Sequence, residues 1–415
     1  MRRLAGTLSA TGLVLALAAS AWAGDAPAAR ETVGKPVQAA QALLKQNRPK
    51  EAIAWLRQAD AVKDKTPYET YVIAETRAAA EIAQADYAAA IASLETVLAT
   101  HVLSPPESAQ RLQTLTQLAY ERKTYPAVVA YAQRYYAQGG AERTPRVLMA
   151  QAEYLGGDFP AAARTLRAQL LDDMRAGRAP PDEDLLLTLA SSESKAGNDT
   201  GYRDALTRLV SAHPKREYWI DLLAALARHG LADRLRLDLD RFRLAVDAFA
   251  APAQYTEAAE RALSAGFPGD ARAFLDHGFV ADAFGAQAGR ARRLADLAAR
   301  QAAEDAERLP ARATAAGTAE TGATWETLGE TYASYGDAAH AITALDHSLR
   351  KGGLAHPEDA TLHLGVACLH AGQTDRAKQL LSSLAEDGAV GELAHLWLIH
   401  DRLETRIPLT KDPRP

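Results

Sequence analysis

Prolines recur along this chain at nearly even intervals. Six of them are separated by 39, 39, 36, 33 and 38 residues, and a seventh follows 105 residues later: Pro67, Pro106, Pro145, Pro181, Pro214, Pro252 and Pro357. Proline is tolerated in the first turn of a helix and excluded from its interior, so a regular spacing marks repeated helix starts. A period of roughly 34 to 40 residues is typical of a stack of two-helix units. The sequence therefore predicts an all-α superhelix.

A second pattern recurs inside each period, in which an alanine follows a glycine by five residues. The pairs are Gly157/Ala162, Gly266/Ala271, Gly336/Ala341 and Gly372/Ala377, with weaker versions at Asn47/Ala52 and Ala85/Ala90. The glycine suits a left-handed turn between two antiparallel helices. The alanine suits the point where the second helix crosses closely over the first. Prolines outside the regular spacing, Pro126, Pro160 and Pro268, are expected to open second helices.

These residues resemble the signature of the tetratricopeptide repeat. Residues 324–345 carry it at Trp325, Leu328, Gly329, Tyr332, Gly336, Ala341 and Leu345. The next unit repeats it at Leu364, Gly365, Gly372, Ala377 and Leu381, and departs from it at Thr361 and Cys368. The chain resembles tetratricopeptide-repeat proteins over most of its mature length, most specifically over residues 322–387. The segment Tyr255–Gly278 also resembles units found in exported proteobacterial proteins of this kind. The resemblance implies a solenoid of about nine to ten helix pairs whose first helices line a concave peptide-binding groove.

The same patterns predict how the chain is divided. We expect a signal peptide over 1–23, a flexible leader over 24–34, helical repeats over 35–280, a long helix and linker over 281–320, two well-matched repeats over 321–387, a capping helix over 388–405 and a disordered tail over 406–415. Within 281–320 the helix is expected from Ala286 to Arg308, followed by a loose connection.

The N-terminus has the pattern of an export signal. Arg2 and Arg3 precede the apolar run Leu13–Ala19, and Ala21-Trp22-Ala23 forms a small-x-small cleavage pattern before Gly24. Arginine outnumbers lysine 36 to 11, which is typical of a high-GC bacterium. We therefore expect a periplasmic protein, cleaved near Ala23-Gly24, with no transmembrane segment in its mature chain.

Catalytic motifs are absent from the sequence. It contains no G-x-x-x-x-G-K-[ST], G-x-G-x-x-G, H-E-x-x-H or G-x-S-x-G pattern. The formal charge of −5 includes Arg2 and Arg3, so cleavage would make it −7, and no basic block suits nucleic acid. The sequence therefore predicts a protein without enzymatic activity, catalytic residues, cofactor or nucleic-acid partner.

Histidines gather near the C-terminus, where seven of eleven lie between His340 and His400. A metal site needs several ligands to converge. His340 and His347 are expected on a second helix, and His363 and His370 on a first helix, so that the two pairs face opposite surfaces of the stack. We therefore expect no metal site. The single cysteine, Cys368, is expected as a small buried side chain.

The inner groove is the candidate binding site. On two successive first helices, the residues expected to face it are Gln110, Gln113, Gln117, Tyr120, Glu121, Val147, Gln151 and Tyr154. Glutamine and tyrosine offer donors, acceptors and flat apolar area without net charge, which suits an extended peptide backbone. A merely solvated helix face is the competing interpretation.

Three functions remain open from the sequence. The first is a non-enzymatic periplasmic scaffold that binds a peptide segment or an envelope protein complex. The second is an enzyme or carrier that holds a cell-envelope glycan or lipid-linked substrate in its groove. The third is a self-associating element that uses the apolar C-terminal helix as its contact.

Overall fold

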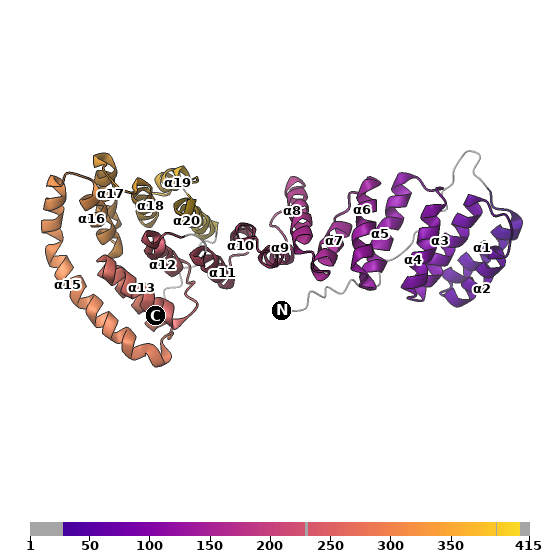
Figure 1. Ribbon diagram of the computed structural model, residues 1–415, viewed down its shortest axis with the longest axis horizontal. Helices are drawn as coiled ribbons and strands as arrows, with labels where there is room; N and C mark the ends of the chain where they lie inside the picture. Colours follow the sequence, from indigo (N-terminus) through magenta and orange to yellow (C-terminus); the bar gives the residue numbers. More distant parts are fainter. Residues whose placement is uncertain (1–27, 229–230, 387, 407–415) are drawn as a thin grey trace. The chain divides into compact units, whose positions relative to one another are not determined.

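The computed structural model describes residues 28–228, 231–386 and 388–406, and these form helices and turns without a strand. The chain divides into two compact units, unit 1 (1–198) and unit 2 (199–415). Figure 1 shows the helices arranged as successive neighbouring pairs. The prediction of an all-α stack of helix pairs is confirmed.

The first unit is a regular stack. Its pairs are formed by neighbours in sequence: α1 with α2, α3 with α4, α5 with α6 and α7 with α8, and α9 packs on α8. The helices are α1 (Glu31–Lys45), α2 (Pro49–Asp60), α3 (Pro67–Ala83), α4 (Tyr87–Ala99), α5 (Pro105–Glu121), α6 (Tyr125–Ala137), α7 (Arg143–Leu155), α8 (Phe159–Arg175) and α9 (Glu183–Lys195).

One turn connects the helices of nearly every pair. A residue with positive φ follows the first helix, and the next N–H donates to the carbonyl five residues back, as Asp158 does to Glu153 at 2.9 Å. This bond is the signature of a Schellman turn. All six turn positions named from the sequence have positive φ, between 57° and 86°: Asn47, Ala85, Gly157, Gly266, Gly336 and Gly372.

The small residues of the second helices are buried where the two helices of a pair cross. The six alanines expected at the crossings are all fully buried: Ala52, Ala90, Ala162, Ala271, Ala341 and Ala377. Five of the seven regularly spaced prolines lie in the first turn of a helix, whereas Pro181 and Pro214 each lie two residues before one. Pro67, Pro252 and Pro357 are first residues of helices, and Pro268 opens the second helix of its pair. Sequence spacing therefore identified both the helix starts and the helix contacts.

The second unit contains one helix much longer than the rest. Its helices are α10 (Asp199–Ala212), α11 (Arg216–Arg228), α12 (Arg236–Ala245) after the short η2 (Asp233–Leu235), α13 (Pro252–Ala265), α14 (Pro268–Val280), η3 (Gly285–Gln287), α15 (Ala288–Thr318), α16 (Ala323–Ser334), α17 (Ala338–Lys351), α18 (Pro357–His370), α19 (Thr374–Ser383) and α20 (Gly388–Arg406). Cys368 on α18 is fully buried and not in a disulfide, as expected.

The long helix α15 reverses the direction of the stack. Beyond it, α16 contacts α14 and α20 contacts α12, so the last five helices lie back along the earlier ones (Figure 1). The helix α15 is a single helix at a point where the earlier part of the stack would have a pair. After it, a first helix such as α16 therefore packs against a second helix such as α14. The helices before α15 form one arm of unit 2 and the helices after it form the other, and the two arms enclose a shared interior.

Two predicted boundaries were wrong. The leader was expected to reach residue 34, but α1 begins at Glu31, because Val33 is fully buried and the Arg30 backbone and guanidinium both donate to Glu69. The loose connection expected after Arg308 is helical to Thr318, through Pro310. There Ala316 is buried, and Arg312 donates to Asp305 at 2.6 Å and to Thr331 at 3.0 Å.

The predicted capping helix is α20, and its apolar side is covered within unit 2. The Trp397 and Phe242 rings lie 4.9 Å apart, Trp219 lies 5.5 Å from Phe242, and Leu393 and Ile399 are buried. These side chains are therefore already in contact with the same chain, and the apolar face assigned to self-association is occupied. The predicted tail lies outside the described residues, except for Arg406, which ends α20.

Replacing Trp397 with alanine should test whether α20 packs on the earlier helices of unit 2. Loss of a large buried aromatic costs about 3–5 kcal/mol, so urea unfolding followed by circular dichroism should show that loss in stability. Trp55→Ala is the matched control, because the Trp55 side chain lies on α2 of unit 1 and is 42% exposed. It should change stability by about 1 kcal/mol or less. Equal losses for the two variants would contradict the packing described for α20.

Candidate functional site

The first helices of unit 1 lie on the side where neighbouring repeats are closest. The α1 helix packs closely on α3, and α5 on α7; the Arg111–Glu75 ion pair joins α5 to α3, and the Tyr154–Ser191 hydrogen bond joins α7 to α9. Among the described residues of unit 1, successive second helices have no comparable contact. In a curved stack the elements approach one another most closely on the concave side. The first helices therefore line the inner face, as the resemblance implied.

The turn hydrogen bond gives a common register for these helices. We define the reference residue of each helix as the one whose carbonyl accepts this bond. In α1, α3, α5, α7 and α9 the reference residues are Leu43, Glu81, Ala119, Glu153 and Glu193, with N···O distances of 2.9, 2.9, 3.0, 2.9 and 2.9 Å. Residues at equal offsets from a reference residue are structurally equivalent, so side chains can be compared between repeats.

The predicted groove residues fall into matched rows in this register. Row A lies six residues before the reference residue, row B two before it and row C one after it. Gln113 and Val147 belong to row A, Gln117 and Gln151 to row B, and Tyr120 and Tyr154 to row C. Because the offsets within a helix are four and three residues, the rows share one face. All six side chains are half-buried, whereas Gln110 and Glu121, at the edges, are exposed.

Tyr154 is the most constrained side chain of this face. Its hydroxyl forms a 2.8 Å hydrogen bond with the Ser191 hydroxyl on α9, and the Lys195 ammonium lies 4.6 Å from its ring centroid. The hydrogen bond with Ser191, followed by the charge of Lys195, lowers the pKa of Tyr154. The bond joins row C of α7 to row B of α9, which confirms that the inner faces of these helices are adjacent.

The inner face differs toward the N-terminus. There Arg111 of α5 donates to Glu75 of α3 at 2.7 Å, and both side chains are close to 90% buried. Glu75 belongs to row A of α3, so this ion pair occupies the groove between α3 and α5. The open part of the face is therefore formed by α5, α7 and α9.

Sequence reasoning missed a pair of buried glutamates in unit 1. Glu81 accepts a 2.7 Å hydrogen bond from Ser93, and the Thr165 hydroxyl partly offsets the effect of burial on the Glu153 pKa; in each case the hydroxyl residue lies twelve residues later on the second helix. Burial raises the pKa of both carboxyl groups. An acid at the reference position with a hydroxyl residue twelve positions later was the available signal. These carboxyl groups lie between the two helices of a helix pair, so they connect those helices and do not line the groove.

The interior of unit 2 holds a cluster of charged side chains around Arg241. The guanidinium is 2.8 Å from Asp270 on α14, 2.9 Å from Asp238 on α12 and 3.0 Å from Glu330 on α16. His363 of α18 completes the cluster, with Nε2 3.0 Å from Asp238 and Nδ1 3.7 Å from Glu330. Four helices from both arms of unit 2 are thereby connected.

The charges in this cluster strongly perturb one another. Burial by itself lowers the pKa of His363, but the charges of Glu330 and Asp238 outweigh it and raise the pKa to about 9. Burial by itself raises the pKa of Asp238, but His363 and Arg241 outweigh it and lower the pKa to about 2. At neutral pH the His363 imidazolium and the Asp238 carboxylate are therefore both charged.

The same residues were tested as a metal site. Asp238, Glu330 and His363 each offer a donor atom within 4.8 Å of the others, and the buried His363 Nδ1 has no hydrogen-bond partner. However, Arg241 already places one nitrogen within 3.0 Å of both carboxylates, where a divalent cation would need to lie. This donor set is neutralised by a fixed cation, which fits an ion-pair network and does not fit a metal centre.

The other C-terminal histidines do not join this cluster. His340 stacks on Tyr332 and His347 on Trp325, and His356 is paired with Glu358, whereas His370 and His400 both pack edge-on against Trp397. The sequence did not identify His363 as part of a cluster. Its partner Asp238 is 125 residues away in sequence and becomes a neighbour only because α15 reverses the stack.

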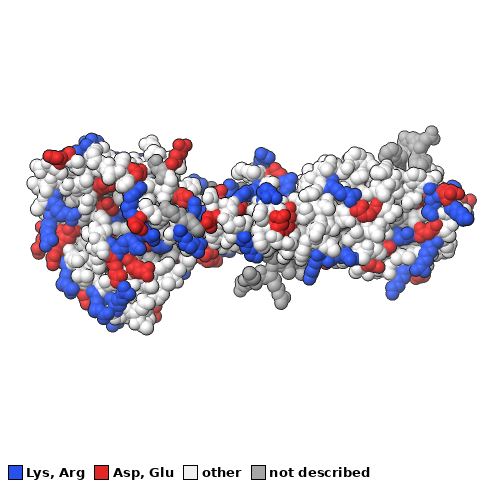
Figure 2. All heavy atoms as spheres, in the orientation of Figure 1, with Lys and Arg blue, Asp and Glu red and all other residues white. Residues whose placement is uncertain are grey.

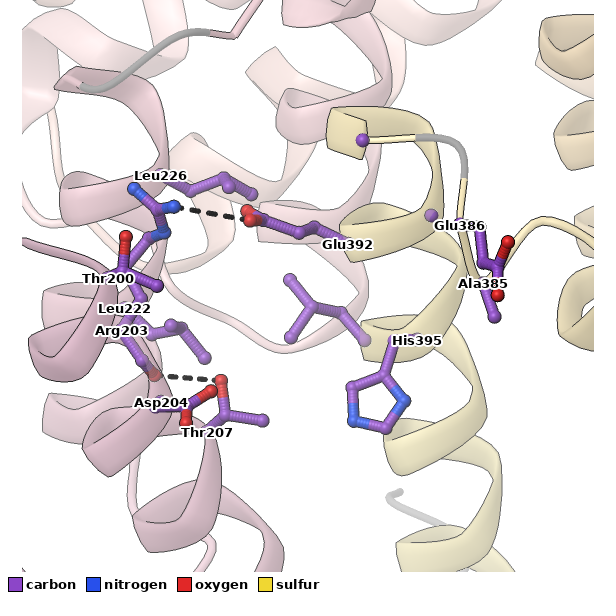
Figure 3. Close-up of a pocket in the computed structure, with 13 residues that line it drawn as sticks. Thr200, Arg203, Asp204, Thr207, Leu222, Leu226, Ala385, Glu386, Glu392 and His395 are labelled. Atoms are coloured by element: carbon purple, nitrogen blue, oxygen red, sulfur yellow. Dashed lines mark hydrogen bonds and ion pairs between the residues drawn. The ribbon is translucent and has the colours of Figure 1, made fainter.

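A cavity of about 440 Å³ lies between α10, α11 and α20 (Figure 3). Leu222, Leu226 and Leu396 form its apolar part, and Arg203 and Glu392 form a 3.3 Å ion pair across it. This ion pair joins α10, the first helix of unit 2, to α20, the last helix of unit 2. The cavity therefore marks where the folded-back arms meet.

No family model matches this sequence, and no curated protein matches it. Solved structures similar to it include the C-terminal part of a TPR repeat-containing protein from Cytophaga hutchinsonii, with 14% identity and TM-score 0.34 over 62% of this chain and 93% of that chain. The TPR2AB domain of yeast Sti1 with pHSP90 has 13% identity and TM-score 0.24 over 70% of this chain and 98% of that chain.

A third similar structure is Naa15/Naa10 bound to HypK, with 15% identity and TM-score 0.29 over 88% of this chain and 60% of that chain. Binding of pHSP90 and HypK is a property of those proteins. At such low identities and TM-scores, the description of the fold rests on the helix pairing and turn geometry of this chain.

The raised pKa of His363 predicts how the stability of unit 2 depends on pH. Since the folded value of about 9 exceeds the unfolded value of 6.5, the contribution of His363 is complete below pH 6.5 and is lost as pH rises through 9. Between these limits the wild type should lose about 3 kcal/mol more than a His363→Gln variant. Urea unfolding monitored by tryptophan fluorescence reports this, because Trp219, Trp325 and Trp397 lie in unit 2.

His356→Gln is the control for this measurement, because His356 is half exposed. It should keep the pH dependence of the wild type. A His363→Gln variant whose stability changes with pH as the wild type does would contradict the charged state assigned to the cluster.

Proposed function

We propose that this chain is a protein-binding scaffold without enzymatic activity, and that it binds a segment of a partner protein on the inner face of α5, α7 and α9. The observation that carries the proposal is the set of matched rows, with glutamine at row B and tyrosine at row C on both α5 and α7. Side chains repeated at equivalent positions present the same groups at regular intervals to an elongated ligand.

The fixed orientation of Tyr154 supports this proposal. Its bond to Ser191 and its contact with Lys195 hold the ring before any partner arrives. A side chain that is already ordered loses less conformational freedom on binding, so more of the contact energy appears as affinity. By contrast, the interior of unit 2 is filled by its own ion pairs, so unit 2 is assigned a structural role.

The surface supports a protein partner over nucleic acid. On the face shown in Figure 2, acidic and basic side chains are interspersed over each unit. With a formal net charge of −5, the chain lacks the excess of basic residues on which phosphate-backbone binding depends.

We place this activity in the periplasm, where the partner would belong to an envelope protein complex. The support is the pattern of basic residues, an apolar run and small-x-small residues that ends at Ala23. Among the described residues, none of the helices combines the length and apolar character needed to cross a bilayer. The exported form would then begin at Gly24.

Affinity capture of partners should depend on the inner face. We expect a Gln117→Glu plus Tyr154→Ala variant to recover its specific partners roughly tenfold less well than the wild type, because it adds a charge and removes the ordered ring. Mass spectrometry after capture from the periplasmic fraction measures this. Gln58→Glu plus Trp55→Ala is the matched control, since both residues are exposed on the second helix α2. Equal recovery by both variants would remove the inner face as the binding site.

Export is tested by N-terminal sequencing of the protein expressed from its full sequence in a proteobacterial host. Cleavage between Ala23 and Gly24 should give a periplasmic product that begins with Gly24-Asp25-Ala26. An Ala21→Arg plus Ala23→Arg variant should remain uncleaved, because the cleavage site requires small residues at these positions. A cytoplasmic product that retains Met1 in the wild type would contradict the proposed location.

A further inference from the structure

The open inner face of unit 1 carries no charged side chain at its three rows. Its nine positions on α5, α7 and α9 are Gln113, Gln117, Tyr120, Val147, Gln151, Tyr154, Leu187, Ser191 and Ser194. Charged residues make up 24% of the chain, so about two of nine positions would be charged at the average composition, and here none is. The chemistry of a ligand for this face is therefore set by neutral groups.

The face combines apolar contact area with unused hydrogen-bonding groups. Leu187 in row A of α9 is 38% exposed, and Tyr120 and Tyr154 in row C are half-buried. The side-chain amides of Gln113, Gln117 and Gln151 form no hydrogen bond with another described residue. Each half-buried amide can both donate and accept, as a peptide backbone requires.

In unit 2 the same register places acidic side chains, instead of neutral ones, at two of the row positions of α16. The reference residue of α16 is Tyr332, whose carbonyl accepts from Asp337 at 3.0 Å, so row A is Glu326 and row B is Glu330. Glu330 lies in the Arg241 ion-pair network, and burial raises the pKa of Glu326. Rows A and B of α16 are therefore acidic where the chain fills its own interior, whereas the rows of α5, α7 and α9 are neutral where the face is open.

We propose that the inner face of α5, α7 and α9 binds an extended, uncharged segment of a partner protein that is rich in aromatic and aliphatic residues. This inference rests on the proposed function and specifies the chemistry of its ligand. Gln117 and Gln151 hydrogen-bond the backbone of the segment, and its apolar side chains contact Tyr120, Tyr154 and Leu187.

The spacing of the helices fits a short extended segment. Neighbouring helices pack roughly 10 Å apart, so α5 to α9 spans about 20 Å. An extended chain rises about 3.3 Å per residue, and about six residues therefore cover the face. Over that length, alternate residues direct side chains to the same side. Two or three apolar residues at alternate positions are the expected recognition element.

A charged segment is disfavoured on this face. Burying a charge without a partner costs more than burying a neutral group, and rows A to C offer none. The Lys195 ammonium, next to row C of α9, lies 4.6 Å from the Tyr154 ring and 4.8 Å from the Phe159 ring. It is therefore engaged by two aromatic faces and is not directed at a ligand carboxylate.

Capped peptides test the proposal by fluorescence anisotropy on the full chain. The probe is a neutral, fluorescein-labelled peptide with phenylalanine and valine at alternate positions. Aspartate or lysine in place of the apolar residues should weaken binding at least tenfold. Methylating alternate backbone nitrogens should weaken it by a similar factor, because the donors that face the glutamine amides are removed.

Protein variants locate the site. Gln117→Glu plus Gln151→Glu should weaken the neutral probe about tenfold, because a carboxylate cannot donate to a backbone carbonyl. The matched control is Gln58→Glu plus Gln138→Glu, both exposed positions in unit 1 on and just after second helices, and it should bind the probe as the wild type does. Circular dichroism on both variants reports that the helices are intact. Unchanged affinity in the inner-face variant would overturn the assignment of the site.

The outcomes separate this inference from the proposed function. If a charged peptide binds more tightly than the neutral probe and the inner-face variant abolishes that binding, the ligand chemistry is wrong and inner-face binding stands. If no peptide binds and partner capture is unaffected by the inner-face variant, the proposed function fails as well. If light scattering shows self-association that the inner-face variant abolishes, a second copy of the chain is the occupant and the proposed partner is wrong.

Discussion

The architecture depends on the turn that reverses the chain after each first helix. A residue with positive φ, such as Gly157, lets the following N–H reach the carbonyl of Glu153 and so ends the helix at a defined residue. The second helix then starts in a fixed direction, and a fully buried alanine, Ala162, lets it pack closely on the first. Because the same bond is repeated from pair to pair, equivalent side chains are presented in rows. The rows of the inner face exist only because this turn is conserved along the stack.

The two units use this repeated frame in opposite ways. In unit 1 the stack continues in one direction, so the inner rows of α5, α7 and α9 remain open. In unit 2 the long helix α15 reverses the stack and brings later helices against α12 and α14, and the carboxylates of Asp238, Asp270 and Glu330 are enclosed between them. Enclosed carboxylates require compensation, which Arg241 and His363 supply at 2.8 to 3.0 Å. Breaking such a network by removing one partner leaves an uncompensated buried charge, which makes the reversed arrangement depend on all of its members.

Local features were predictable from the sequence, and long-range ones were not. Proline spacing and the glycine–alanine pattern identified helix starts, turns and crossings, since each follows from the backbone conformation of a few neighbouring residues. The same logic placed Gln117, Gln151, Tyr120 and Tyr154 on inner helices. It missed the helix beyond Pro310, because packing of Ala316 and the bonds of Arg312 outweigh the absent proline N–H. It also missed the Arg241 cluster, whose members meet only after the stack reverses.

Comparison of row positions between the units distinguishes a binding face from a structural one. Glu330 and Gln117 occupy the same offset from the turn, but the glutamate is held by ion pairs while the glutamine amide has no partner among the described residues. A charged group at an enclosed position stabilises only the arrangement that neutralises it. In the free protein, a neutral amide at an open position hydrogen-bonds water, at little cost in stability. When a peptide backbone replaces that water, the amide hydrogen-bonds the backbone and so stabilises the complex. The neutral rows therefore remain stable without a ligand and are complementary to one, which is what a reversible peptide-binding surface requires.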